Sequence, residues 1–272
     1  MRDLLNSFLQ YEHLKGVEAA LGVPAWVMIG SAGLMFIGWT GCYIATIRRG
    51  FRDKAYGIPV LSTALNISWE FVFAFSVFGP LPSFYFPLKW GHRLWVCIDI
   101  FNVVLIFKYG KALQSSEWTR KWFYPIAVVT FIVAGPALYL FMSYINDVDG
   151  VVTAMVMDFM IAVMSIGMFA NRVNMRGLSL SAAWFRFVGD TASFVFLYYW
   201  WPAQFANGVL KNVERISTFE NIPEPHSYLF LNTLYFVIPL VDLLYIYLLT
   251  TKSRETKKAQ GLRLKAQGLV QA

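Results

Sequence analysis

The chain has 272 residues, of which 57% are hydrophobic and only 14% are charged. Soluble domains are about 45–50% apolar and about 25% charged, so this composition excludes an ordinary soluble enzyme. The formal net charge of +7 does not indicate a nucleic-acid partner, because the basic residues flank apolar segments, as is typical of membrane proteins.

The first 22 residues contain acidic side chains spread among apolar ones and lack the continuous apolar core of a secretory signal. The apolar positions within 4–11 favour a short amphipathic helix that lies at the membrane interface, and a frayed terminus is the alternative. We therefore predict an interfacial segment at 1–22, followed by a transmembrane catalytic domain at 23–250.

Seven apolar blocks follow, each roughly 20 residues long, which is the length that crosses about 30 Å of hydrocarbon. No internal repeat is visible, so we predict an all-α membrane protein, a single bundle of seven transmembrane helices. Gly135 and Pro136 are expected to kink the fourth helix, where neighbouring helices can satisfy the freed backbone groups. The predicted spans are 24–47, 58–78, 92–109, 122–144, 151–171, 179–201 and 229–250.

Positive charge is distributed unequally between the two ends of these spans. Sixteen of the 23 Lys and Arg residues lie in the 48–57, 108–121 and 172–178 loops and in the tail after Thr250. Because Lys and Arg favour the cytoplasmic side, we predict an outside or lumenal N-terminus and a cytoplasmic C-terminus. The basic tail at 251–272 is expected either to rest on anionic lipid or to be disordered.

Several ionisable side chains lie inside the predicted spans, where a charge is expensive and usually faces the interior of the bundle. One base cannot neutralise five acids by pairing, and a purely structural membrane protein does not need so many buried acids. We therefore expect a buried polar site with a chemical function. The residues are Glu70, Asp99, Asp158, Arg186, Asp190 and Asp242.

Helical spacing predicts partners for some of these groups. Arg186 and Asp190 are four residues apart, so we expect an ion pair within one helix. Asn66 lies one turn before Glu70 on the same face and can donate a hydrogen bond to it. By the same spacing, Asn102 accompanies Asp99, and Tyr245 accompanies Asp242.

The depth of the acids in the membrane predicts that they share a site. Glu70 and Asp242 both lie near the expected bilayer midplane, and Asp99 and Asp158 lie nearer the outer end of their spans. One cavity open towards the outer or lumenal leaflet would contain all four. Asp158 has no polar neighbour at helical spacing, so for this residue a structural hydrogen bond between helices is the preferred interpretation.

Buried acids next to aromatic side chains indicate a particular chemistry. Burial favours the protonated form of a carboxyl, and a second carboxylate nearby adds to the effect. Such a group can donate its proton to a substrate. Aromatic residues make up 18% of the chain, and rings that line a pocket, such as Trp69, would stabilise a cation. Together these features favour chemistry in which a carbocation forms on a hydrocarbon chain.

Three stretches of the sequence resemble the small integral-membrane terpene cyclases of meroterpenoid and indole-diterpene biosynthesis. The resemblance extends over most of the chain, from the first predicted span to the seventh. The stretches are Asn66-x-x-Trp69-Glu70, Arg93-x-Trp95-x-x-x-Asp99, and Arg176-Gly177-x-Ser179 followed by Trp184-x-Arg186-Phe187-x-Gly189. The chain departs from the family at Asp190, where a small hydroxyl residue is expected.

The resemblance implies a seven-helix bundle that uses neither a metal nor an organic cofactor. It implies an isomerase- or lyase-type cyclase of secondary metabolism that protonates an epoxide or an alkene of a prenylated small molecule, drawn from the lipid bilayer. The membrane would be the endoplasmic reticulum in a eukaryote or the inner membrane in a bacterium. Glu70 and Asp242 are the implied catalytic acids, and the supporting residues are Asn66, Trp69, Asp99, Asn102, Arg186, Asp190 and Tyr245.

Other classes of protein share some of these features. A proton-coupled small-molecule transporter is compatible with acids at the midplane, although the spans show no repeated halves. A retinal receptor is disfavoured, because the last span has Asp242 but no lysine for a Schiff base. Asp147-Val148-Asp149-Gly150 is a partial match to the acid motif of soluble terpene cyclases, and its position between two spans favours a simple turn.

Overall fold

The computed structural model describes residues 24–77, 86–145, 147, 150–172, 174–206 and 224–270. The interfacial helix predicted for residues 1–22 lies outside this part of the chain. Within the described residues the secondary structure is entirely helical, as predicted. The helices are α3 (Ala25–Asp53), α4 (Val60–Phe75), α5 (Phe86–Tyr109), α6 (Glu117–Tyr144), α7 (Val151–Ala170), α8 (Leu180–Ala206) and α9 (Glu224–Val270), with a 3-10 turn, η2 (Lys111–Leu113).

Each helix overlaps one of the seven predicted segments, and local chemistry sets several of the boundaries. Helices α3 and α4 begin directly after Pro24 and Pro59, whose fixed φ suits the start of a helix. Helix α6 begins at a Ser116 cap, whose hydroxyl accepts a hydrogen bond from the Thr119 backbone N–H at 3.1 Å. Helix α4 ends at Ser76, which has a left-handed backbone.

Five of these helices, α3, α5, α6, α7 and α9, are long and apolar enough to cross a membrane. Helix α4 is apolar but has only 16 residues. Helix α8 is long, but Arg186 and Asp190 lie within it. Five spans of this kind make the chain an integral membrane protein.

The outer surface of the bundle is apolar, whereas ionisable groups lie inside it. On α6 the side chains of Ile132 and Leu140 are 66% and 67% exposed, and on α9 that of Phe236 is 69% exposed. By contrast, Glu70 and Asp242 are essentially buried, at 1% and 0%. Lipid can cover such a surface without cost, and buried charges away from lipid are typical of membrane bundles.

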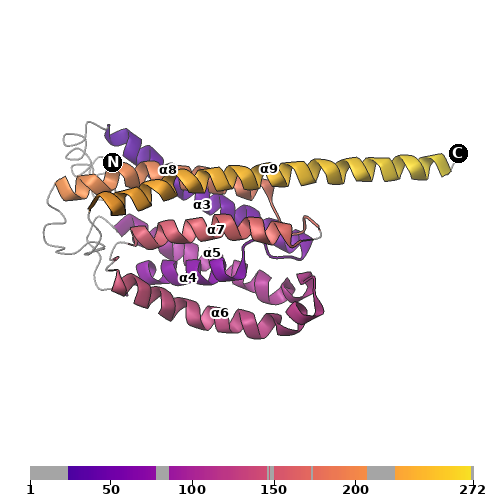
Figure 1. The fold of residues 1–272 in the computed structure, drawn as a ribbon, viewed down its shortest axis with the longest axis horizontal. Coiled ribbons are helices and arrows are strands. Elements are labelled where there is room, and N and C mark those ends of the chain that lie inside the picture. Colours follow the sequence, from indigo (N-terminus) through magenta and orange to yellow (C-terminus); the bar gives the residue numbers. More distant parts are fainter. Residues whose placement is uncertain are drawn as a thin grey trace.

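The helices run side by side, and α9 continues far beyond the bundle (Figure 1). Helix α3 packs against α8 and α5, α4 packs against α5, α6 and α7, and α9 packs against α7 and α8. Helix α6 is continuous through Pro125 and Pro136, and it bows rather than breaking where a kink was expected (Figure 1). The basic tail is helical as far as Val270, which corrects the disordered alternative.

Two glycines, Gly38 and Gly189, let α3 and α8 approach each other closely. A Cβ atom at Gly38 on α3 would lie 2.8 Å from the Phe185 carbonyl oxygen of α8 and would overlap the backbone of Gly189. Only the absence of side chains lets the two backbones come so near, a device common between transmembrane helices. The close contact matters for function, because α8 carries Arg186.

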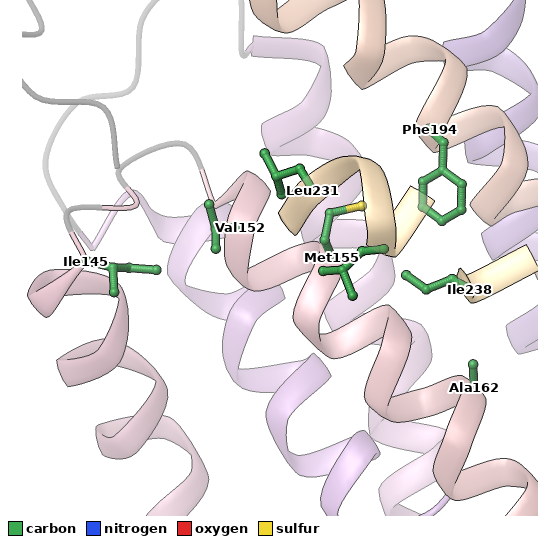
Figure 2. Packing of buried hydrophobic residues seen from close by; sticks show 8 residues of the cluster. Ile145, Val152, Met155, Ala162, Phe194, Leu231 and Ile238 are labelled. Carbon is green, nitrogen blue, oxygen red and sulfur yellow. The ribbon is translucent and has the colours of Figure 1, made fainter. Parts of the chain in front are cut away.

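Apolar packing fixes the other side of the bundle. Met155 of α7 lies beside Ile238 of α9, with Phe194 of α8 next to them (Figure 2). Met155 and Ile238 are 1% and 0% exposed. This cluster fixes α9 against α7 and α8, and so sets the position of Asp242, which lies one turn beyond Ile238.

The predicted turn before α7 is confirmed at Asp147. Its carboxylate caps the helix by accepting hydrogen bonds from the backbone N–H groups of Val152 and Thr153, at 3.2 and 2.8 Å. Gly150 has a φ of +73°, a conformation that favours glycine. Asp147 therefore has a structural role.

Arginines tie together the two loops at the other end of the bundle. Arg172 donates a hydrogen bond to the Tyr56 carbonyl oxygen at 2.7 Å, and Arg176 donates one to the Asp53 carbonyl oxygen at 2.9 Å. The backbone N–H of Gly177 reaches the Asp53 carboxylate at 3.1 Å. The Arg176-Gly177 stretch thus joins the loop before α8 to the loop before α4.

Candidate active site

Glu70 lies at the centre of a buried network between α3, α4 and α5. Its Oε1 atom accepts hydrogen bonds from the Tyr43 hydroxyl at 3.0 Å and from the Asn66 amide at 2.9 Å, so the predicted Asn66–Glu70 pair is confirmed. Its Oε2 atom is buried and accepts no hydrogen bond from any described residue. A buried, charged carboxylate oxygen that accepts no hydrogen bond is energetically costly. This cost makes Oε2 the atom of Glu70 that most needs an explanation.

Asp99 belongs to the same network. The Asn66 amide nitrogen lies 2.8 Å from Asp99 Oδ2, and the Asn102 amide donates to Asp99 Oδ1 at 2.8 Å. Asn66 therefore bridges the carboxyl groups of Glu70 and Asp99, which are 1% exposed each. Two acids held this close by one amide do not both ionise easily, because the negative charges would repel each other in a medium of low polarity.

Arg186 and Asp242 form a second buried network between α7, α8 and α9. Two nitrogens of the guanidinium group, Nε and Nη2, contact Asp242 Oδ1 at 2.9 and 2.5 Å. Nη1 donates to the Ser165 hydroxyl at 2.8 Å. The guanidinium carbon lies 5.1 Å from the centre of the Tyr245 ring, within range of a cation–π contact. The network therefore holds one cation firmly inside the bundle.

The structure corrects the predicted ion pair between Arg186 and Asp190. The partner of Arg186 is Asp242, on a different helix. Asp190 is 0% exposed, and neither of its oxygens accepts a hydrogen bond from an N–H or hydroxyl group in the described part of the chain. Asp190 lies within electrostatic range of Asp158, Asp242 and Arg186. Nε and Nη2 of Arg186 both donate to the single oxygen Oδ1 of Asp242, and hydrogen bonds between charged groups are stronger than neutral ones.

A narrow cavity with both polar and apolar side chains in its lining lies between the two networks. Asn66, Asp99 and Tyr43 line one wall, and Arg186 and Ser165 line the other. Its free volume is about 30 Å³, far below the several hundred Å³ of a typical ligand pocket. Glu70, Asp158 and Asp242 are not among the lining residues. The predicted single cavity containing four acids is therefore wrong, because the acids divide between two networks with the cavity between them.

Aromatic side chains gather on the other side of Glu70. The imidazole of His92 on α5 is surrounded by the rings of Trp69, Phe73 and Trp95, with centroid separations of 4.9, 5.6 and 5.4 Å. His92 is 6% exposed, and its Nδ1 atom has no hydrogen-bond partner among the described residues. We call these four residues the aromatic cluster. Trp69 is itself held by a hydrogen bond from its Nε1 to the Thr153 hydroxyl, at 3.1 Å.

Sequence reasoning missed Tyr43, Ser165 and His92. Helical spacing relates residues of one helix only. It therefore could not connect Tyr43 or Ser165 with an ionisable group on another helix. His92 did have a signal, because it precedes Trp95 and Asp99 at spacings of three and seven residues, on one face of α5. Within the described residues, no three His, Cys, Asp or Glu side chains are arranged to hold a metal ion.

Comparison with known proteins decides the family. The family model of the Pyr4-like transmembrane terpene cyclases matches residues 21–210, more than half of the chain. The chain belongs to this family. No solved structure matches it.

Named relatives agree with the family match. The chain is 27% identical to the Pyr4-family terpene cyclase mfmH of Annulohypoxylon moriforme, over 60% of this chain and 67% of that protein. It is 27% identical to terpene cyclase ascF of Acremonium egyptiacum, over 69% and 75%. It is 28% identical to terpene cyclase macJ of Penicillium terrestre, over 75% and 76%.

The region that matches the family model contains the network around Glu70 but only part of the network around Arg186. Glu70, Asn66 and Asp99 lie inside residues 21–210, as does Arg186. Asp242 lies outside it, on α9. The ion pair of Asp242 with Arg186 ties α9 to the matched part of the chain.

Proposed function

We propose that this protein is a membrane-bound terpene cyclase that protonates an epoxide or an alkene of a prenylated, meroterpenoid-type substrate and guides the cyclisation of the carbocation. Glu70 is the proton donor. The observation that carries the proposal is its Oε2 atom, which is buried and accepts no hydrogen bond from the described residues, while Oε1 is held by Tyr43 and Asn66. A carboxyl oriented through one oxygen can keep a proton on the other and present it in a fixed direction.

The reaction needs no change in the overall formula of the substrate. The O–H bond at Oε2 of Glu70 breaks as its proton passes to the epoxide oxygen, or to one carbon of an alkene. Opening of the C–O bond, or protonation of the double bond, leaves a carbocation. Neighbouring double bonds attack this carbocation in turn and form C–C bonds, and loss of one C–H proton from the last cation closes the sequence with a new double bond.

The aromatic cluster suits the later steps. Its rings offer negative faces to a migrating positive charge, and they provide no oxygen that would trap it. The Nδ1 atom of His92 has no hydrogen-bond partner among the described residues, and a neutral imidazole can accept the proton that the final cation loses.

Asp242 contributes through Arg186 in this proposal. The ion pair holds the guanidinium at the wall of the cavity that faces Asp99 and Asn66. The resemblance implied Asp242 as a second catalytic acid. In this proposal Asp242 is needed because it forms the ion pair with Arg186. Asp158 and Asp190 lie within electrostatic range of the same pair, and the positive charge of Arg186 offsets part of their repulsion with Asp242.

The test uses membranes containing the full chain and a prenylated aromatic compound, supplied both with and without a terminal epoxide. We expect cyclised product, with mass unchanged, from the wild type. Glu70→Gln keeps the size of the side chain but cannot donate an acidic proton, so it should lose at least 100-fold in rate, since general acid catalysis contributes about 10²–10⁴-fold. Asp242→Asn should also lose most activity.

The matched control is Asp147→Asn, another buried acid, whose carboxylate caps the start of α7 and accepts a hydrogen bond from the Thr153 hydroxyl at 2.7 Å. It should cyclise the substrate whenever it folds. Normal cyclisation by Glu70→Gln would overturn the assignment of the acid. Transport of the unchanged compound into liposomes, without cyclised product, would instead support the transporter interpretation.

A further inference from the structure

The cavity between the two networks lies on one side of Glu70, and the aromatic cluster lies on the other. Along α4 the cavity touches Thr63 and Asn66, which precede Glu70, whereas Phe73 of the aromatic cluster follows it. Along α5, which pairs with α4, the cavity touches Asp99, and His92 lies seven residues earlier. Along α4, Glu70 therefore lies between the part of the chain that lines the cavity and Phe73, which contacts His92.

The cavity leads away from Glu70 towards the loops at one end of the bundle. Its lining includes Gly57 and Ile58, in the loop before α4, and Ser179, directly before α8. All three residues are half-buried rather than buried. The cavity thus connects the acid network with residues that solvent can reach.

The size and chemistry of the cavity suit water. A free volume of about 30 Å³ is enough for roughly two water molecules, each of which needs about 10–15 Å³ and two to four polar partners. Asp99, Asn66, Tyr43 and the hydroxyl group of Ser165 line it. A prenyl chain would not fit in this volume.

Tyr43 joins the cavity to Glu70 directly. It lines the cavity, and its hydroxyl donates a hydrogen bond to Glu70 Oε1 at 3.0 Å. A hydroxyl can receive a proton from water on its oxygen while it passes its own proton on. This makes Tyr43 the only described side chain that both lines the cavity and donates a hydroxyl proton to Glu70.

We propose that this cavity is the proton-supply route of the enzyme, which reloads Glu70 through Tyr43 after each cyclisation, an inference that rests on the proposed function. Each reaction leaves Glu70 as a carboxylate, while the proton of the final cation leaves on the aromatic side. A hydronium ion in the cavity gives a proton to the Tyr43 oxygen, the Tyr43 hydroxyl proton passes to Oε1 of Glu70, and water remains. Rotation of the reloaded carboxyl group then exchanges the positions of its two oxygens and presents the proton to the substrate. The layout delivers protons to the acid while water stays away from the carbocation.

The test separates the first reaction from those that follow. Ala182 lines the cavity on α8 and is 7% exposed, so Ala182→Val fills the route. The matched control is Ala192→Val, on the same helix and also 7% exposed, but away from the cavity. Both variants are mixed with substrate, first with enzyme in excess and then with substrate in excess. A second test variant, Tyr43→Phe, keeps the ring and removes the relay.

With enzyme in excess, we expect Ala182→Val to form product at a rate within about threefold of wild type, because Glu70 is already loaded. With substrate in excess, Ala182→Val should stop after about one product per enzyme, and turnover should fall at least tenfold. Tyr43→Phe also removes a hydrogen bond that orients Glu70 Oε1, so its rate should fall in both assays, with the larger loss when substrate is in excess. Lower pH should restore part of the turnover of Ala182→Val, since the proton concentration limits reloading. Ala192→Val should behave as wild type in both assays.

Two results would overturn the inference. Equal losses of rate in the two assays would show that the variants damage the site itself. Unchanged turnover of both variants with substrate in excess would show that the proton reaches Glu70 by another route. Neither result would touch the proposed function, as long as the wild type cyclises its substrate. Failure of the wild type in both assays would count against the proposed function instead.

Discussion

At the scale of single residues, the central feature is that several buried ionisable groups have a hydrogen-bond partner on another helix. Asn66 of α4 contacts Asp99 of α5, Tyr43 of α3 contacts Glu70 of α4, and Arg186 of α8 contacts Asp242 of α9. Removing one member of such a pair leaves the other buried and unsatisfied, which costs more than removing both. Stability measurements can therefore reveal the pairs independently of catalysis.

Arg186→Met tests the second network. We expect it to lower the free energy of unfolding by about 3–5 kcal/mol, because three acids, Asp158, Asp190 and Asp242, then remain without their cation. Thermal unfolding of the purified protein in detergent measures the change. The double variant Arg186→Met/Asp242→Asn should be more stable than Arg186→Met alone. A single variant as stable as wild type would contradict the importance of the ion pair.

At the scale of the helices, the contact of α3 with α8 sets the geometry of the site. Helix α3 supplies Tyr43 to the first network, and α8 supplies Arg186 to the second. The cavity lies between these two residues, so its width depends on how closely the helices approach. The glycine pair of Gly38 and Gly189 decides that distance.

Gly38→Ala should therefore disturb both folding and activity. The new methyl group would meet the α8 backbone, which cannot move like a flexible side chain, and overpacking of this kind costs about 1–3 kcal/mol. Gly33→Ala, on the same helix, is the control, since a Cβ atom there has nothing within 4 Å. Thermal unfolding in detergent should separate the two variants. Equal stability would mean that α3 and α8 can separate without cost.

At the scale of the whole molecule, the distribution of basic residues and the course of α9 favour one orientation of the chain in the membrane. The loops that hold Arg172 and Arg176 lie at the same end of the bundle as the loop before α4. Lys252 of α9 donates a hydrogen bond to the Arg172 carbonyl oxygen at 3.0 Å. The basic part of the chain is thus gathered at one end, which we assign to the cytoplasm.

Protease protection in sealed microsomes tests this orientation and the proposed count of seven spans. A reporter fused after Ala272 should be digested without detergent, because the C-terminus is expected in the cytoplasm. A reporter fused before Met1 should be protected until detergent opens the vesicles. Protection of both reporters, or of the C-terminal one alone, would contradict the proposed topology.

The sequence by itself determined the helical class, the segments that became helices and the Asn66–Glu70 pair, because these depend on composition and on the 3.6-residue period of a single helix. Only the tertiary structure decided that Arg186 binds Asp242 rather than Asp190, that Tyr43 reaches Glu70, and that the acids form two networks. Those contacts join helices far apart in the chain. Their distances are set by packing, such as the close approach at Gly38, which no local pattern contains.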